Sequence, residues 1–288
     1  MPAVLMSQKI SLTAGFTTFS FNSEVQSFVY GIQEFTVSHG SKTRHELATF
    51  KIDLSHQKDG QKITVTANVK FENGTGKGLS KSDSFVVVTM LAWIKDDPSS
   101  DVFFGNFSNI KTNSDSPVVQ LPQTPVDLNG VISGFNMSYG GAGSGKYVRS
   151  INTSISPNRS GQNASLHAVT NFTNKNQKTP TTANVNGGMI ATYSSNPGFE
   201  IVVVNASSTS EQNVTFSQPV QQPFLMVTSY HATFGNPAYR PNNVKLVGSL
   251  TGSGTTWTIK PNFQISNGHN RKTSSFNVQM LAIGVYAS

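Results

Sequence analysis

The chain of 288 residues contains no cysteine, and this absence excludes two kinds of structure. Without thiols, neither a disulfide framework nor a thiolate metal site can form, so packing alone must hold the fold. A disulfide-stabilised extracellular design is therefore disfavoured. The sequence has no run of about 18 apolar residues, and the N-terminal stretch lacks a basic segment followed by an apolar one. We expect a soluble protein without a classical signal peptide or membrane insertion, either cytoplasmic or non-classically secreted.

Charged residues are scarce, at 12% of the chain, and the shortage of acidic ones leaves a net charge of +7. The basic residues are scattered singly or in pairs such as 271–272, without the Lys/Arg cluster or aromatic motif of a nucleic-acid-binding domain. We therefore expect no specific nucleic-acid partner. A positive field of this kind does favour anionic surfaces, including acidic glycans, at low salt.

Patterns that carry catalysis or bind metals are missing as well. The six histidines lack paired metal-ligand spacing, no GxSxG motif occurs, and the 14 acidic residues offer no clear pair for glycoside hydrolysis. Residues 140–146 (GGAGSGK) resemble a phosphate-binding loop, but Tyr147 stands where a magnesium-binding hydroxyl is required, and a strand pattern follows where a helix is required. We predict a protein that is not an enzyme and has neither a cofactor nor a metal ion.

The chain contains one six-residue pattern that occurs three times. Its order is an aromatic residue, a polar residue, an apolar residue, a hydroxyl residue, an aromatic residue or histidine, and glycine. The copies are residues 35–40 (FTVSHG), 135–140 (FNMSYG) and 230–235 (YHATFG). Each copy is followed by an apolar strand-like ending, at residues 90–92, 189–191 and 280–282. A period of about 95 residues corresponds to one small domain per copy. We therefore predict modules at residues 1–97, 98–207 and 208–288.

Alternation with a period of two recurs at the same place in every module. In residues 63–71 (ITVTANVKF) the apolar side chains share one face, and residues 257–265 repeat the pattern around Pro261, which favours a sheet edge or a bulge. Residues 85–94 are apolar on both faces, which is typical of a strand covered on both sides. No stretch shows helical periodicity. We predict an all-β fold of three tandem antiparallel β-sandwich modules, packed with pseudo-threefold symmetry.

The third module resembles a known family. Residues 214–227 (VTFSQPVQQPFLMV) place a phenylalanine-bearing strand before a proline turn and a second apolar strand, and residues 269–283 begin with His269 and Asn270. Both runs resemble H-type lectin domains, which are β-sandwiches that associate as trimers and bind N-acetylgalactosamine through the loop of that histidine. The resemblance implies that His269 and Asn270 contact a glycan. The first two modules share the resemblance only through their similarity to the third.

The surface composition leads to the same class of function. Sugars need directional hydrogen bonds and an apolar platform, which hydroxyl and amide groups with aromatic residues at loop ends supply. Tyr239 and Arg240 could converge with His269 and Asn270 at one end of the third module. We favour plugging of the sandwich ends as the role of the residues before each motif glycine, namely His39, Tyr139 and Phe234.

We predict a non-catalytic, multivalent carbohydrate-binding or adhesive protein whose partners are glycans or glycoconjugates. The alternative belongs to a different class: a structural, self-assembling β protein, such as a shell, fibre, crystal or toxin-complex component, that associates through its sheet edges. A homo-oligomer stays open under both hypotheses. Light scattering at increasing concentration distinguishes them, because an assembly protein grows and a lectin stays a defined species.

Overall fold

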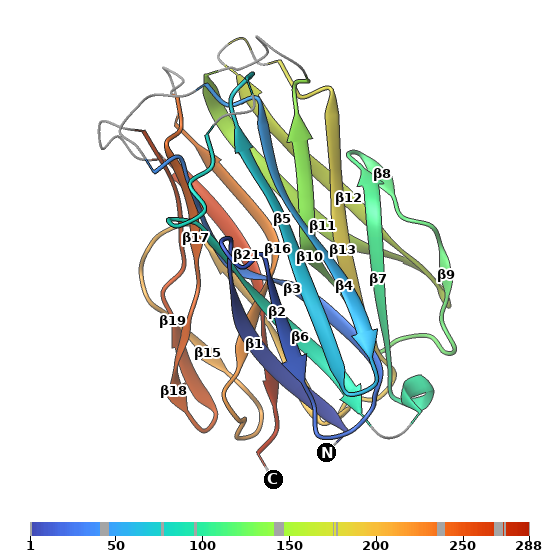
Figure 1. The fold of residues 1–288 in the computed structure, drawn as a ribbon. Coiled ribbons are helices and arrows are strands. Elements are labelled where there is room, and N and C mark those ends of the chain that lie inside the picture. Colours follow the sequence, from blue (N-terminus) through green and yellow to red (C-terminus); the bar gives the residue numbers. More distant parts are fainter. Residues whose placement is uncertain are drawn as a thin grey trace.

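The computed structural model describes residues 2–40, 46–75, 78–94, 97–140, 147–174, 176, 178–234, 240–267, 273 and 275–287. Within these residues the chain is built of antiparallel strands, with one 3-10 turn at Pro98–Ser100 (Figure 1). The predicted all-β antiparallel fold is thus confirmed. The described part contains no helix long and apolar enough to cross a membrane.

The strands form three consecutive sets along the chain. The first set is β1 (Ala3–Ser11), β2 (Phe16–Ser20), β3 (Val25–Ser38), β4 (Thr49–Asp59), β5 (Lys62–Glu72) and β6 (Phe85–Ile94). The second is β7 (Val102–Lys111), β8 (Ser114–Asp115), β9 (Val119–Gln120), β10 (Asp127–Ser138), β11 (Val148–Ser160), β12 (Asn163–Asn174) and β13 (Thr182–Thr192). The third is β14 (Phe199–Ala206), β15 (Gln212–Thr215), β16 (Phe224–Thr233), β17 (Asn243–Val247), β18 (Leu250–Ser253), β19 (Thr256–Ile259), β20 (Asn262–Ser266) and β21 (Ser275–Val285).

Each set repeats one pairing order, in which the first strand pairs with the last and the last pairs with a long central strand. These triplets are β1-β6-β3, β7-β13-β10 and β14-β21-β16. β14 ends at Ala206, before the module boundary predicted at 207/208, yet it pairs with β21 along its whole length. Strand pairing therefore groups β14 with the strands that follow it, and the module boundaries themselves stay predictions.

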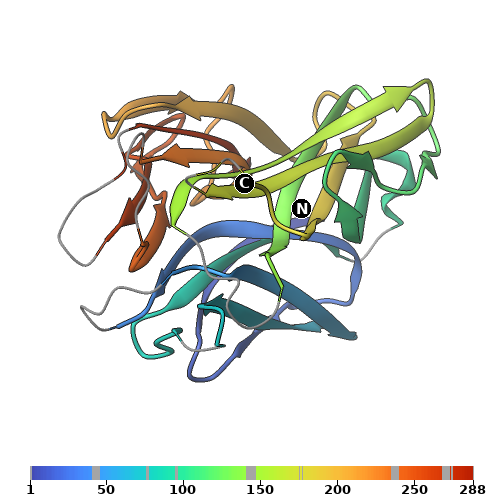
Figure 2. The ribbon, with the colours of Figure 1, turned by 90° about the horizontal axis from the view of Figure 1, so that it is seen from above.

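The three sets share their large sheets. β3 pairs with β17 of the third set, β10 with β4 of the first, and β16 with β11 of the second. The resulting sheets are β1-β6-β3-β17-β20, β2-β5-β4-β10-β13-β7 and β14-β21-β16-β11-β12-β8, beside a small sheet of β15, β19 and β18. Seen from above, the blue, green and orange-red groups surround a common centre (Figure 2). Each set therefore completes its sheets with strands from the other two.

The three copies of the repeated motif meet at this centre. The ring centroid of Phe35 lies 6.2 Å from that of Phe135 and 5.9 Å from that of Tyr230, and the last two are 5.6 Å apart. All three residues are at most 1% exposed. From the repeated sequence, the repeated pairing and this common contact, we infer an approximate threefold arrangement about the three rings.

The hydroxyl and glycine of the motif end the central strand. The backbone N–H of Gly40 donates to Ser38 Oγ at 3.0 Å, and that of Gly140 donates to Ser138 Oγ at 3.1 Å. Both glycines have positive φ angles, 70° and 88°, which non-glycine residues rarely adopt. The turn therefore explains these residues in the first two copies, whereas Gly235 of the third copy lies outside the described residues.

The residue between the hydroxyl and the glycine packs against the end of a sandwich. His39 stacks on Phe71 with ring centroids 4.4 Å apart, and Tyr139 meets Phe172 edge-on at 4.7 Å. Phe234, in the third copy, is buried. This packing agrees with the interpretation that these residues plug the sandwich ends.

The last strand of each set is covered on both faces. β6 is buried from Val86 to Ile94, as its apolar sequence predicts. Alternate residues of β6 face different clusters: Met90 lies in the main core, whereas Leu91 and Trp93 lie in a second core with Met226 of the third set. The second core joins the sets to one another, so the closing strands hold both the sandwiches and their assembly.

Candidate functional site

The structure describes one of the four residues predicted to bind a glycan. The guanidinium of Arg240 lies 3.3 Å from Glu46 Oε1, and its Cζ lies 4.8 Å from the ring centroid of Tyr147. These three residues come from three different strand sets, so Arg240 connects the sets at this end of the molecule. His269, Asn270 and Tyr239 lie outside the described residues, as does the 141–146 part of the loop that resembles a phosphate-binding loop.

A cleft of about 290 Å³ opens between the first and second sets, and we call it the Asp53 cleft. β4 pairs with β10 only from Thr49 to Asp53, and the cleft lies where this pairing ends. The residues that line it are Tyr30, Asp53, Leu54, Ser55, His56, Asn106, Phe107, Ser108, Asn109 and Asn186. The cleft thus combines polar groups and rings from two strand sets.

A chain of hydrogen bonds fixes the polar side of the Asp53 cleft. Asn186 Nδ2 donates to Asp53 Oδ1 at 2.8 Å, and the backbone N–H of Asn109 donates to Asn186 Oδ1 at 2.8 Å. Lys51 Nζ lies 3.0 Å from the second carboxylate oxygen, Asp53 Oδ2. Asn109 has a φ of 57°, in the left-handed region that asparagine tolerates better than most residues. These contacts join protein groups only, so the positions of the Asp53 and Asn186 side chains do not depend on a ligand.

Aromatic rings also line the cleft. The hydroxyl of Tyr30 donates to the backbone oxygen of Leu54 at 3.2 Å, and His56 Nδ1 lies 3.2 Å from the same hydroxyl. The His56 ring meets Phe28 edge-on at 4.9 Å and Tyr30 at 5.4 Å, between centroids. Phe107, half-buried on β7, completes the apolar lining.

Burial controls the protonation of two groups in the cleft. It raises the pKa of Tyr30 to about 12, with a smaller contribution from the negative charge of Asp53. Burial also lowers the pKa of His56 below its usual value. At neutral pH the cleft therefore presents a neutral phenol and a neutral imidazole beside Asp53.

Acidification is expected to destabilise the fold through His56 and His231, because burial lowers the pKa of both. A histidine whose pKa is lower in the folded state stabilises the fold fully above the unfolded pKa, about 6.5, and this contribution is lost as the pH falls through the folded-state pKa. Urea unfolding on either side of this window measures the loss. The double variant His56→Gln/His231→Gln should lose less stability on acidification than the wild type, and an equal loss would contradict the assignment.

Sequence reasoning missed the Asp53 cleft because its residues come from distant strands without a motif. One signal was present: in the aligned copies, the residue before the first motif aromatic is Glu34, Gly134 or Ser229. A Cβ on Gly134 would lie 2.8 Å from the backbone oxygen of Ile52 and 3.2 Å from Asn186 Nδ2. The glycine marks the close approach of β4 and β10 beside the cleft.

Comparison with known proteins gives no match, either to a protein-family model or to a curated protein. Among the described residues, no group of three or more His, Cys, Asp or Glu side chains is placed to hold a metal ion. The geometry of the cleft is therefore the basis for a functional hypothesis.

Proposed function

We propose that the protein is a non-catalytic, multivalent carbohydrate-binding protein and that the Asp53 cleft is a glycan-binding site. The observation that carries the proposal is the meeting of a fixed Asp–Asn network with aromatic rings in one cleft. The cleft volume, about 290 Å³, is near the lower limit of ordinary ligand pockets, about 300 Å³, and suits a ligand of monosaccharide size.

The network and the rings have complementary roles. The Asp53 carboxylate accepts hydrogen bonds from ligand hydroxyls, and such charge-assisted bonds are stronger than those between neutral groups. The rings of Phe107 and His56 offer an apolar surface to the C–H face of a sugar. Because Asn186 and Asn109 are already held in place, binding loses little additional conformational entropy. The partners proposed are glycans or glycoconjugates, as the resemblance to H-type lectins also implies.

The variant Asp53→Ala is expected to weaken glycan binding about 10- to 100-fold, because hydrogen bonds to a charged group contribute about 1.5–3 kcal/mol. A glycan array on the intact protein identifies the ligand, and calorimetry measures the affinity. Asp59→Ala, which removes a carboxylate from the exposed end of the same strand, should bind like the wild type.

Three outcomes count against this proposal. Background signals across the array for a folded wild-type protein would reject carbohydrate binding. Unchanged affinity of Asp53→Ala would reject the cleft as the site. Equal losses in Asp53→Ala and Asp59→Ala would show an effect of net charge rather than of the cleft.

A self-assembling structural role is the second candidate function. The observation that favours it is β14, which lies at the edge of its sheet and carries Val203 with 50% of its surface exposed. Exposed apolar edge strands pair readily with other chains. Light scattering that rises with protein concentration, and falls in a Val203→Lys variant, would support this candidate. A constant particle size would exclude it.

A further inference from the structure

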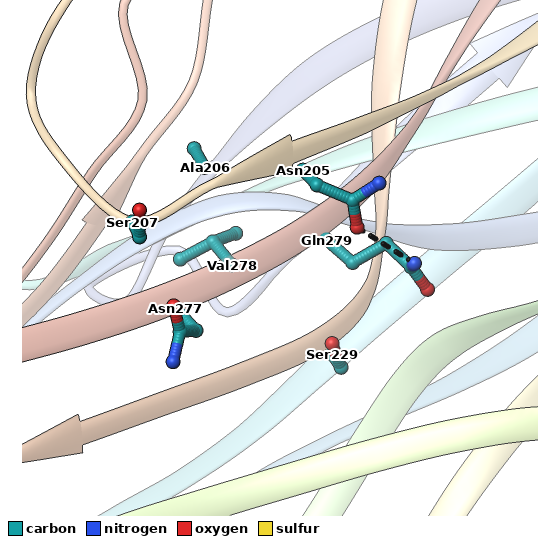
Figure 3. Close-up of a pocket in the computed structure, with 7 residues that line it drawn as sticks. All are labelled: Asn205, Ala206, Ser207, Ser229, Asn277, Val278 and Gln279. Carbon is teal, nitrogen blue, oxygen red and sulfur yellow. Dashed lines mark hydrogen bonds between the residues drawn. The ribbon is translucent and has the colours of Figure 1, made fainter.

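A second cavity, of about 300 Å³, lies on the third strand set, and we call it the Gln279 pocket. Figure 3 shows its lining, which consists of Asn205, Ala206, Ser207, Ser229, Asn277, Val278 and Gln279. These residues belong to β14, β16 and β21 or directly follow β14. The pocket is therefore built on the same triplet of strands that, in the second set, carries one side of the Asp53 cleft.

Strand register places the two cavities at corresponding positions. The pairing of β10 with β13 shifts between Ile132 and Gly134, and that of β16 with β21 shifts between Val227 and Ser229. In both cases the shift falls two residues before the first aromatic of the motif. Directly after the shift, Gly134 pairs with Asn186, and Ser229 pairs with Gln279. By register, Gln279 thus corresponds to Asn186, whose side-chain amide is at the centre of the hydrogen-bond network in the Asp53 cleft.

Hydrogen bonds hold the Gln279 side chain in place, as they hold the side chain of Asn186 in the Asp53 cleft. Thr228 Oγ1 donates to Gln279 Oε1 at 2.8 Å, and Gln279 Nε2 donates to Asn205 Oδ1 at 2.8 Å, the bond dashed in Figure 3. Thr228 is only 4% exposed, and its hydroxyl also lies 3.2 Å from the backbone oxygen of Gln279. The amide is therefore held in one orientation before a ligand arrives.

The chemistry of the two cavities differs. Ser154 pairs with Ser229 where Asp53 pairs with Gly134, so the register position of the carboxylate holds a serine. The lining of the Gln279 pocket consists of amides, hydroxyls and two small apolar residues, without charged or aromatic side chains. A charged ligand group would lose hydration here without gaining an opposite charge. Amide and hydroxyl groups can both donate and accept, which matches an uncharged partner with the same capacity.

We propose that the Gln279 pocket is a second binding site, selective for an uncharged hydroxyl- or acetamido-bearing group such as a neutral sugar, an inference that rests on the proposed carbohydrate-binding function. The chain then carries two non-identical sites on one rigid scaffold. In the first set the corresponding positions hold Glu34 paired with Val87, so the amide is absent there. Because different residues occupy these register positions in the second and third sets, the two sites select different ligands.

The test uses the intact chain and the side-chain amide signals of Asn205, Asn277 and Gln279 in 15N–1H spectra. The probes are glucose, N-acetylglucosamine and N-acetylgalactosamine, with glucuronic acid as the anionic comparison. We expect the pocket signals to shift with a neutral sugar in the wild type and in Asp53→Ala. The shifts should vanish in Ser229→Arg, whose side chain fills the pocket. Thr66→Arg, exposed on β5, is the matched control and should behave like the wild type.

A second variant tests the pocket even if Ser229→Arg does not fold. Asn205→Ala removes an amide at the exposed rim and should weaken binding at the pocket about tenfold, the cost of losing a neutral hydrogen bond of about 1.5 kcal/mol. The other amide signals report whether either variant is folded.

The outcomes separate the inference from the proposed function. Shifts confined to Asn109 and Asn186 would overturn the second site and leave the Asp53 cleft standing. Shifts at the pocket alone would support the second site and reject the cleft. The absence of shifts at both places would overturn both. Glucuronic acid binding at the pocket as tightly as the neutral sugars would overturn the selectivity.

Discussion

Replacing Phe135 with alanine is expected to lower the free energy of unfolding by about 3–5 kcal/mol, the usual cost of removing a fully buried phenylalanine ring. Its ring centroid lies 4.8 Å from that of Phe50, and Phe35 and Tyr230 are also in contact. Because these neighbours belong to the first and third sets, the cavity opens where all three sets meet. Urea unfolding followed by circular dichroism measures the loss.

The control for this variant is Phe16→Ala, on an edge strand. Phe16 is 56% exposed, so its removal should change stability by less than about 0.5 kcal/mol. We also expect Phe135→Ala to unfold in one transition, since each large sheet joins two sets. Equal stability of the two variants would show that the three-ring contact contributes nothing to the fold.

A chain cut once between Ser208 and Thr209 is expected to stay together as one particle. Both residues are exposed, so a protease site can be inserted there. Three strand pairings then cross the cut: β14 with β21, β11 with β16, and β3 with β17. Their backbone hydrogen bonds and the shared cores oppose separation in the way an obligate interface does.

Size-exclusion chromatography after cleavage, with dilution to nanomolar concentration, tests this expectation. The cleaved and intact proteins should elute together, and the two fragments should separate only in denaturant. Separation in native buffer would show that residues 209–288 form an independent module joined to the rest by a linker.

Local features of the fold were predictable from the sequence because they depend on neighbouring residues. The run around Pro261 is an exception, since residues 257–265 were predicted as one alternating strand with the proline at an edge or a bulge. β19 ends at Ile259 and β20 begins at Asn262, and the two strands pair in different sheets. The prediction of one continuous strand is therefore wrong, and the proline lies where the chain passes from one sheet to another. The run from Phe85 to Ile94 was predicted correctly as a strand covered on both faces.

The exchange of strands between sets could not be predicted in the same way. The alternating pattern of β4 fits any neighbour that offers a complementary edge, whether that neighbour is its own β3 or the β10 of the next set. A pattern with a period of two specifies the buried face of a strand but not its partner. Because the copies share their strand patterns, the repeat itself makes these alternatives equally compatible with the sequence.

The candidate site was harder still to predict. Asn186 and Asp53, which share a hydrogen bond, are separated by 133 positions in the sequence. Neither belongs to a motif, and the cleft lies where β4 ends its pairing with β10, at Asp53. Arg240, which the sequence pointed to as a ligand contact, forms an ion pair with Glu46 of the first set. Its contribution to glycan binding stays a prediction, as do those of His269, Asn270 and Tyr239.

The pairing of β3 with β17 determines when the first sheet can be completed during synthesis. Thr36 and Lys245 are register partners, so the sheet stays open until the ribosome has made most of the chain. Contacts between such distant residues form slowly, and an open strand edge accepts other strands in the meantime. A nascent first set can therefore take β17 from a neighbouring chain. Crowded polysomes would then favour pairs of chains linked by exchanged strands, each with every sheet complete.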